Sequence, residues 1–405
     1  MNTVNTTGSR EAENSRVEGT VTAIFNLGCL FSALSCIHVG DILGRKRTFM
    51  LGLIITIIGS ILQVGAFSLP HLTIGGFVAG FGFGGVTATG PNWYSFIFLF
   101  DWISSVTWRL PLASPCFLCL ISLCWAPVWP DSPRWLIKKG RIEEAREILA
   151  MLRDEPSDSP SLVHQIEEIE ASLQETGQGS FRDIFRNGPA RFANRAFIAV
   201  STQMGQQICG ANAITFYQST IYKNYLGMSG NLALLMSAVL FTWKMIIAPV
   251  GALTIDKAGR RKSHSSSSTS AFYVSGCIGL TYLYCSEIAP LAVRTQITGM
   301  STASSWAFNF LVVEVTLSGF SSLGWKYFII YAAISFVLLV PMVYFLFPET
   351  ESLHLEVIDN IFLDSKHVFQ PVSAAKSLRK HARRQGAHGE LQVYEKATEE
   401  HKEVV

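Results

Sequence analysis

Residues 48–72 read TFMLGLIITIIGSILQVGAFSLPHL, without a single charged side chain. The same character continues to Pro130, because Asp101 and Arg109 are the only charged residues between Thr48 and that proline. A soluble core cannot bury so long an uncharged stretch, whereas a bilayer takes up one apolar helix of about 20 residues after another. We therefore expect an all-α polytopic membrane protein.

The composition of the 405-residue chain excludes several classes of protein. Charged residues make up 15% of the chain, against about 25% in a typical soluble protein, and hydrophobic residues make up 49%. The net charge of +2 gives no reason to expect a nucleic-acid partner. No nucleophile–base pair or metal-ligand cluster emerges, and the eight cysteines all lie in apolar stretches, where we interpret them as small buried side chains. We expect neither an enzyme nor a bound cofactor or metal.

Two blocks of apolar runs are separated by a polar segment. The runs lie near residues 19–40, 49–69, 71–89, 92–107, 110–129, 196–221, 229–252, 271–287, 295–320 and 326–347. We divide the chain into a polar N-terminal segment (1–18), a membrane bundle (19–130), a central loop (131–195), a second membrane bundle (196–347) and a polar tail (348–405) that we expect to be disordered. In the central loop, apolar spacing over 142–152 and 162–173 predicts short amphipathic helices on the membrane surface.

Clusters of basic residues orient the two blocks, because cytoplasmic loops carry an excess of Lys and Arg. Residues 45–47, the central loop, residues 260–262 and the tail are therefore expected to be cytoplasmic. Between residue 262 and the tail the sequence has three apolar runs, and an odd number of spans cannot join two cytoplasmic segments. We infer that one span is missing in this region.

Two short motifs recur at nearly the same separation. The sequence DILGRKR at residues 41–47 returns as DKAGRRK at residues 256–262, and PDSPR at residues 130–134 returns loosely as PET at residues 348–350. Two unrelated pairs with nearly the same offset indicate two homologous halves. Parallel repeats of this kind, related by an axis along the membrane normal, build one large class of secondary transporter.

With these motifs the chain resembles the sugar porters of the major facilitator superfamily, nearest to the fungal-type hexose and lactose permeases, from about residue 19 to residue 358. Two further motifs carry the resemblance: QQICGAN at residues 206–212, followed by Phe216 and Tyr217, and SEIAP at residues 286–290 with Arg294. The resemblance implies two pseudo-repeated helical bundles that move a hexose or small oligosaccharide by alternating access. It also implies a location in the plasma membrane, with the lipid bilayer and the sugar as partners.

The sharpest candidate site lies in the first helix of the second bundle. Amide side chains in an apolar helix are costly unless they face polar partners, and they offer both donors and acceptors to a neutral polyhydroxylated ligand. Offsets of four and seven predict that positions 206, 210 and 217 share one helical face. The alternative is that the amides join helices to one another. By resemblance, the sugar-contacting residues are Gln206, Gln207, Asn212, Phe216, Tyr217, Tyr282, Trp306 and Asn309; for Trp306 plain packing stays open.

The repeated motifs suggest a second group of residues that holds a gate. The resemblance implies a charge network at the cytoplasmic helix ends made of Asp41, Gly44, Arg45, Lys46, Arg134, Asp256, Gly259, Arg260, Arg261, Glu287, Arg294 and Glu349. Topology signals or solvated surface charges are the alternative. Lys244 lies about 18 Å along its helix from Asp256, and Glu314 about 30 Å from Arg294. This difference in depth disfavours a direct Lys244–Glu314 pair.

The chain departs from the family pattern in several places. The first span and its acidic residue have no counterpart, parts of the fourth and fifth helices and the ninth span are missing, and Gly76 stands at the fourth-helix arginine position. About ten of the family's twelve spans remain. We therefore expect that proton coupling is lost, although protons stay possible partners if it survives. A non-transporting sugar sensor, or a truncated product without function, are the alternatives to transport.

Overall fold

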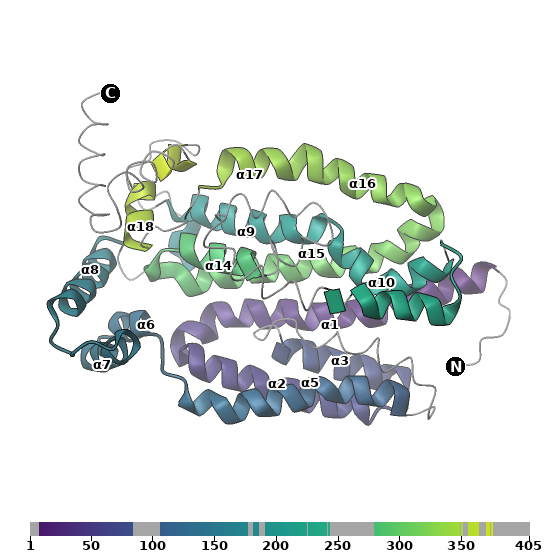
Figure 1. Ribbon diagram of the computed structural model, residues 1–405, viewed down its shortest axis with the longest axis horizontal. Helices are drawn as coiled ribbons and strands as arrows, with labels where there is room; N and C mark the ends of the chain where they lie inside the picture. The colour runs from purple at the N-terminus through teal and green to yellow at the C-terminus, as the bar shows by residue number, and fades with distance from the viewer. Residues whose placement is uncertain are drawn as a thin grey trace.

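The computed structural model describes residues 8–83, 106–176, 181–185, 191–224, 226–240, 242–243, 279–348, 350, 355–363, 370–372 and 374–375. Within these ranges every regular element is helical. Long helices lie side by side as rods, and shorter helices gather at one end of the molecule (Figure 1). The predicted all-α architecture is confirmed.

The first bundle consists of α1 (Gly8–Leu43), α2 (Arg45–Val64), α3 (Leu69–Phe83) and α5 (Val106–Trp125). Helix α3 packs on α1 and α2, and α5 packs on α2. Small residues allow this close packing. A Cβ added at Gly80 would lie 2.1 Å from the Phe25 carbonyl oxygen of α1, so only glycine fits there.

The second bundle is arranged around α15 (Arg294–Leu323), which packs on α9 (Phe192–Ile208), α10 (Ala211–Asn224) and α14 (Gly279–Ile288). After η7 (Gly324–Lys326), the chain turns back through α16 (Tyr327–Ile334), the π-helical η8 (Ser335–Leu339) and α17 (Val340–Leu346). These last three elements form one rod that runs above α9 (Figure 1).

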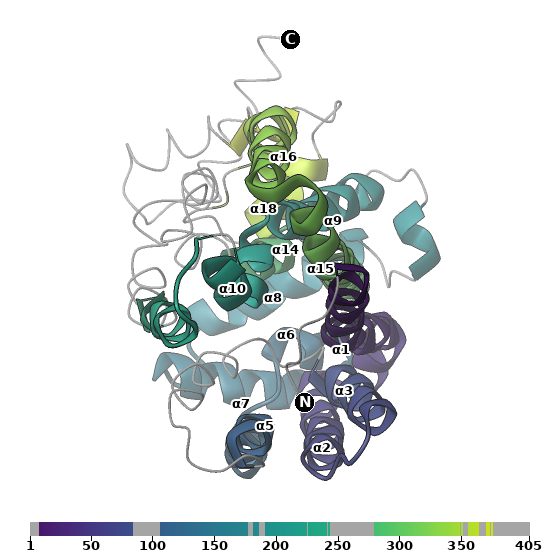
Figure 2. The ribbon, with the colours of Figure 1, turned by 90° about the vertical axis from the view of Figure 1, so that its right-hand side faces the viewer.

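The two bundles meet along α1 and α15. Figure 2 shows α2, α3 and α5 on one side of this pair and α9, α14 and α16 on the other. The seam is closely packed: Ala33 of α1 contacts Ala303 and Trp306 of α15, and a Cβ added at Gly299 would lie 2.7 Å from Ile37. Any rocking of one bundle against the other must therefore alter this seam.

The apolar run predicted over residues 196–221 is two helices, not one. Helix α9 ends at Ile208, Gly210 has a φ of +81°, and α10 begins at Ala211. A left-handed φ favours glycine, and a Cβ here would lie 2.5 Å from the Tyr331 ring. Tyr217 also has non-helical backbone angles. The prediction that positions 206, 210 and 217 share one helical face is therefore wrong.

Three helical stretches are long and apolar enough to cross a membrane: Ala23–Gly40, Lys46–Val64 and Tyr327–Leu346. Leu69–Phe83, Pro115–Val128 and Gly230–Leu240 are shorter apolar helices. The run expected at 92–107 lies almost entirely outside the described residues, and so does the first half of the run at 271–287. The predicted number of spans stays a prediction.

The central loop is built from α6 (Pro133–Lys138), α7 (Ile142–Arg153), α8 (Pro160–Thr176) and η3 (Phe181–Phe185). Helices α7 and α8 lie where the apolar spacing predicts them, but protein covers their apolar faces. The cluster comprises Leu136, Ile137, Ala145, Leu149, Leu162, Ile166, Ile169 and Leu291. Leu291 belongs to η6 (Leu291–Val293) of the second bundle, so the central loop packs on that bundle, and the predicted location of its helices on the membrane surface stays a prediction.

Part of the tail that we expected to be disordered is helical. Helix α18 (Leu355–Leu363) contacts the C-terminal part of α14. Ile358 and Phe362 of α18 are buried against Ile198, Tyr284 and Ile288. A short amphipathic helix has a face to bury, and the exposed ends of α9 and α14 provide the matching surface.

Candidate functional site

Two adjacent glutamines of α9 turn toward different neighbouring helices. Gln206 and Gln207 are both buried, with 7% and 5% of their surface exposed. The Thr281 hydroxyl of α14 donates to Gln206 Oε1 at 3.1 Å, and Gln207 Nε2 donates to the Ser305 hydroxyl of α15 at 2.6 Å. Consecutive helical residues point about 100° apart, which accounts for the two directions.

The break at Gly210 brings Asn212 onto Gln207. Asn212 Nδ2 donates to Gln207 Oε1 from the first turn of α10. On a continuous helix, residues five positions apart point about 140° away from each other and could not bond in this way. The turn between α9 and α10 therefore joins Asn212 to Gln207; this pair and the adjacent Gln206, which faces Thr281 of α14, are together called the amide cluster.

The aromatic residues divide into two groups. Tyr217 is buried in a cluster with Ala23, Ile221 and Phe320, and its hydroxyl donates to the Val313 carbonyl oxygen at 3.1 Å. These contacts make it a packing residue between α10, α1 and α15. Phe216, its neighbour, is 40% exposed, and Tyr282 of α14 interacts with the Ser305 hydroxyl beside Gln207.

Trp306 and Asn309 lie at the seam between the bundles. Trp306 is buried against Cys29 and Ala33 of α1, and its indole Nε1 has no hydrogen-bond partner among the described residues. Asn26 of α1 donates through Nδ2 to Asn309 Oδ1 at 3.2 Å, across the seam. An unpaired buried donor costs free energy, so a ligand that accepts from the indole would be favoured here.

Several polar residues of this region escaped sequence reasoning. Asn26 could have been found, because an amide in the apolar run 19–40 carries the same cost as those of α9. Gln203 is fully buried one turn before Gln207, and its amide has no partner among the described residues. Thr281 and Ser305 gave no signal, because serine and threonine in a helix can bond to their own backbone.

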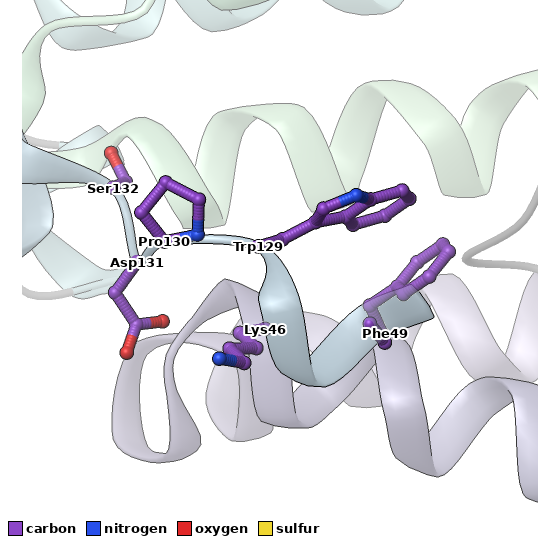
Figure 3. Close-up of a pocket in the computed structure, with 7 residues that line it drawn as sticks. Lys46, Phe49, Trp129, Pro130, Asp131 and Ser132 are labelled. Carbon is purple, nitrogen blue, oxygen red and sulfur yellow. The ribbon is translucent and has the colours of Figure 1, made fainter. Parts of the chain in front are cut away.

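Lys46, one of the predicted gate residues of the first bundle, lies at a pocket at the ends of α2 and α5. Lys46 and Asp131 line it together with Phe49, Ala126, Trp129, Pro130 and Ser132 (Figure 3). Lys46 Nζ donates to the Pro127 carbonyl oxygen at 2.9 Å, and the rings of Phe49 and Trp129 lie 5.6 Å apart. The two motifs of the first bundle thus meet in space.

Gly44 links the same two motifs. Its φ is +81°, and a Cβ at this position would lie 2.8 Å from the Trp135 ring of α6. Both the backbone conformation and the ring contact require glycine. Arg134 is partly buried near the start of α6. The DILGRKR loop and the PDSPRW segment are therefore connected through the approach of Gly44 to Trp135 and through the pocket that Lys46 shares with residues 130–132.

The predicted gate residues of the second bundle that the structure describes are Glu287 and Arg294. The Thr350 hydroxyl donates to Glu287 Oε2 at 2.6 Å, and the Tyr284 hydroxyl donates to the Pro348 carbonyl oxygen at 2.9 Å. Arg294 is buried and donates through Nε to the Ala289 carbonyl oxygen. The PET segment is therefore held against the end of α14.

Other predicted residues lie outside what the structure describes. They are Lys244, Asp256, Gly259, Arg260, Arg261 and Glu349, together with the side chains of Asp41 and Arg45. The assignment of all of these except Lys244 to the gate, and the depth of Lys244 in the membrane, stay predictions. Glu314, by contrast, is described: it accepts a hydrogen bond through Oε1 from the Thr20 hydroxyl of α1 at 3.1 Å, which adds a second polar link across the seam.

Comparisons with known proteins cover most of the chain. The family model described as "Sugar (and other) transporter" matches residues 1–97, 94–279 and 267–362. The MFS-type transporter oryC of Aspergillus oryzae is 30% identical over 86% of this chain and 78% of its own length. The sugar transporter STL1 of Saccharomyces cerevisiae is 27% identical over 88% of this chain and 74% of its own length.

Among solved structures, the fold is similar to that of the proton:xylose symporter XylE bound to 6-bromo-6-deoxy-D-glucose. The TM-score is 0.71, with 20% identity over 87% of this chain and 90% of that one. For the inward-open conformation of the xylose transporter XylE from E. coli, the TM-score is 0.59 with 17% identity, over 86% and 89% of the two chains. The arrangement of helices is thus more similar to the analogue-bound structure than to the inward-open one.

Proposed function

We propose that this chain moves a hexose or small oligosaccharide across a membrane by alternating access, because it belongs to the Sugar (and other) transporter family of the major facilitator superfamily. The single observation that carries the proposal is the amide cluster of Gln206, Gln207 and Asn212 inside the second bundle. Amides supply neutral donors and acceptors in pairs, which is what a sugar's hydroxyl groups require.

The proposed binding site lies between this cluster and the seam. Gln206, Gln207, Asn212 and Tyr282 would face the sugar from one side, and Trp306 and Asn309 from the α1–α15 seam. Trp306 offers an indole N–H that lacks a partner among the described residues, as well as a ring face for an apolar sugar surface. Phe216 would close the site from α10, and Tyr217 would hold α10 in place through packing.

Alternating access requires contacts that differ between two states of the bundles. Two sets of contacts in this structure join the central loop to the second bundle. Lys138 Nζ of α6 donates to the Ala292 carbonyl oxygen at 2.9 Å, and Leu291 packs against α6, α7 and α8. We propose that these contacts form a cytoplasmic gate, which separates when the bundles rock about the α1–α15 seam.

The second part of the proposal concerns the driving force of sugar transport. Gly76 stands where the family resemblance implies an arginine that pairs with the coupling acid, so we propose facilitated diffusion without proton coupling. A protonophore applied to vesicles that contain the protein should leave the initial rate of sugar uptake unchanged. Loss of concentrative uptake on adding the protonophore would contradict this part and leave sugar transport itself in place.

The distribution of Lys and Arg residues supports an orientation of the protein in the membrane. We propose that the protein resides in the plasma membrane, with the central loop and the C-terminal tail in the cytoplasm, because both are polar and rich in Lys and Arg. Epitope tags placed after Gly140 and at the C-terminus should be labelled by antibody only after permeabilisation of cells. Labelling of intact cells at either tag would reverse the assigned orientation.

Uptake measurements test the central proposal. The full chain, purified in detergent and reconstituted into liposomes, should take up radiolabelled D-glucose or another hexose in a saturable manner, with counterflow from preloaded vesicles. Gln207→Ala should lower the affinity for sugar. Folded protein that shows neither saturable uptake nor counterflow for any hexose, pentose or disaccharide would overturn transport. Transport that is unaffected by Gln207→Ala would overturn the site.

A further inference from the structure

We propose that Ser305 is a positioning residue: its hydroxyl fixes the orientation of the Gln207 amide and thereby sets which sugar hydroxyls the site selects. The inference rests on the proposed function, because it concerns the same site. Ser305 does not itself need to touch the sugar. It is 1% exposed and lies on α15 directly beside the α9 glutamine.

Both ends of the Gln207 amide are engaged by different helices. Nε2 donates to Ser305 of α15 at 2.6 Å, and Oε1 accepts from Asn212 of α10. Held at both ends, the amide cannot rotate about its last bond without breaking at least one hydrogen bond. Ser305 supplies one of these two restraints, so its removal leaves the amide held by Asn212 alone.

This orientation determines what the site presents to a ligand. Among the residues that the structure describes, the second N–H of Gln207 Nε2 remains available as a donor, and Asn212, which donates through Nδ2, keeps its carbonyl oxygen as an acceptor. A sugar hydroxyl can accept from the first and donate to the second. A fluorine in its place can only accept, and a deoxy position can do neither. A site built to bond a hydroxyl strongly rejects an analogue that lacks it.

Two comparisons with nearby hydroxyl residues support a positioning role for Ser305. Thr281 holds Gln206 in a comparable way, with its hydroxyl 3.1 Å from Gln206 Oε1, so each glutamine of the pair is oriented by one hydroxyl from a neighbouring helix. Ser304, the adjacent residue of α15, has a buried hydroxyl without a partner among the described residues. Its hydroxyl plays no part in the cluster, which makes it a matched control for the same substitution.

The experiment measures uptake of D-glucose and of its monodeoxy and monofluoro analogues by the reconstituted full chain. For Ser305→Ala we expect the KM for D-glucose to rise about three- to tenfold, with the maximal rate within about twofold of wild type. We also expect the discrimination between D-glucose and at least one deoxy analogue to fall by a similar factor. Ser305→Thr, which keeps the hydroxyl, should restore discrimination, and Ser304→Ala should leave KM and discrimination unchanged.

A double variant separates positioning from general damage. If Ser305 acts through Gln207, and not through Tyr282, which also interacts with its hydroxyl, adding Ser305→Ala to Gln207→Ala should not raise the KM further; a further rise would overturn positioning through Gln207. Should Ser305→Ala fail to fold, Ser305→Cys keeps the volume with a weaker hydrogen bond, and we expect an intermediate rise in KM. Unchanged KM and discrimination in a folded Ser305 variant, with an effect of Gln207→Ala intact, would overturn the positioning role alone. Absence of any effect of Gln207→Ala would instead overturn the proposed site.

Discussion

Arg195, at the start of α9, is completely buried and paired with Asp359 of the C-terminal helix α18. Its Nη2 donates to the Asp359 carbonyl oxygen at 2.9 Å, its Nη1 reaches the Ile288 carbonyl oxygen at 3.4 Å, and its guanidinium lies 4.4 Å from the centre of the Phe362 ring. One arginine thus joins α18 to α9 and α14. The tail segment 355–363 is part of the folded unit.

Removing the carboxylate from this pair should destabilise the protein strongly. In Asp359→Ala the Arg195 charge stays buried without its counter-ion, and we expect a loss of about 3–5 kcal/mol of stability, measured by thermal unfolding in detergent. The double replacement Arg195→Met with Asp359→Leu removes both charges and should cost clearly less. Equal losses for the single and double variants would show that packing, and not the ion pair, holds α18.

Gly44 should be far less tolerant of a side chain than Gly140, although both have a positive φ. Gly140→Ala adds a methyl group in open space, with a φ of +76°, and should cost about 1 kcal/mol for the backbone alone. Gly44→Ala adds the same backbone cost and a collision with Trp135, so we expect a loss of about 2 kcal/mol or more. Thermal unfolding of the two variants decides the point. Equal shifts would show that the Trp135 contact relaxes at no cost.

The buried hydrogen bond across the seam should matter more than the exposed one. Asn26→Ala leaves the Asn309 amide buried without its partner, and we expect a loss of about 1–3 kcal/mol with faster hydrogen exchange in both α1 and α15. Thr20→Val breaks the exposed link to Glu314 and should cost less than about 1 kcal/mol. Hydrogen-exchange mass spectrometry on both variants provides the comparison. A larger effect of Thr20→Val would place the main polar contact of the seam at Glu314.

The turn before α8 should lose stability in acid. Glu155 accepts hydrogen bonds from the hydroxyls of Ser161 and Ser159, and these bonds lower the pKa of its carboxyl below the usual 4.5. Since the folded state favours the ionised form, the stabilisation is complete above the unfolded pKa and disappears as the pH falls through the folded pKa. Exchange protection of residues 159–163, corrected for intrinsic rates, should therefore fall below about pH 4.5.

Glu155→Gln is the matched control for this turn, because glutamine keeps an acceptor oxygen and does not titrate. In this variant the protection of residues 159–163 should not change over the same range of pH. A parallel loss of protection in both proteins would assign the acid sensitivity to another group.

Much of the fold follows from hydropathy. The apolar runs at 49–69, 110–129 and 326–347 correspond to α2, to α5 with the 3-10 turn η2 (Ala126–Val128), and to the rod from α16 to α17. The amide cluster was also foreseeable, since the cost of burying Gln206 and Gln207 is visible in the sequence alone. In each case the signal is one of composition, which does not depend on what the helix packs against.

The remaining features depend on tertiary contacts that no local pattern reveals. Gly210 reads as one more small residue in an apolar run, and only its +81° φ against the Tyr331 ring shows that the helix ends there. Ser305 resembles any other helix serine until Gln207 is placed beside it. Helix α18 is short, and its structure depends on the buried Arg195 that it covers.

The packing of the central loop has a consequence for chain continuity. Helix α7 precedes the exposed turn at residues 154–158 and α8 follows it, yet both helices share one apolar cluster, and α8 contacts η6 of the second bundle. If the chain were cut in this turn, each of the two fragments would therefore still present a large surface that packs against the other fragment, in addition to the α1–α15 seam. The peptide bond between the two halves contributes proximity during assembly, whereas the folded halves are held together by their own complementary surfaces.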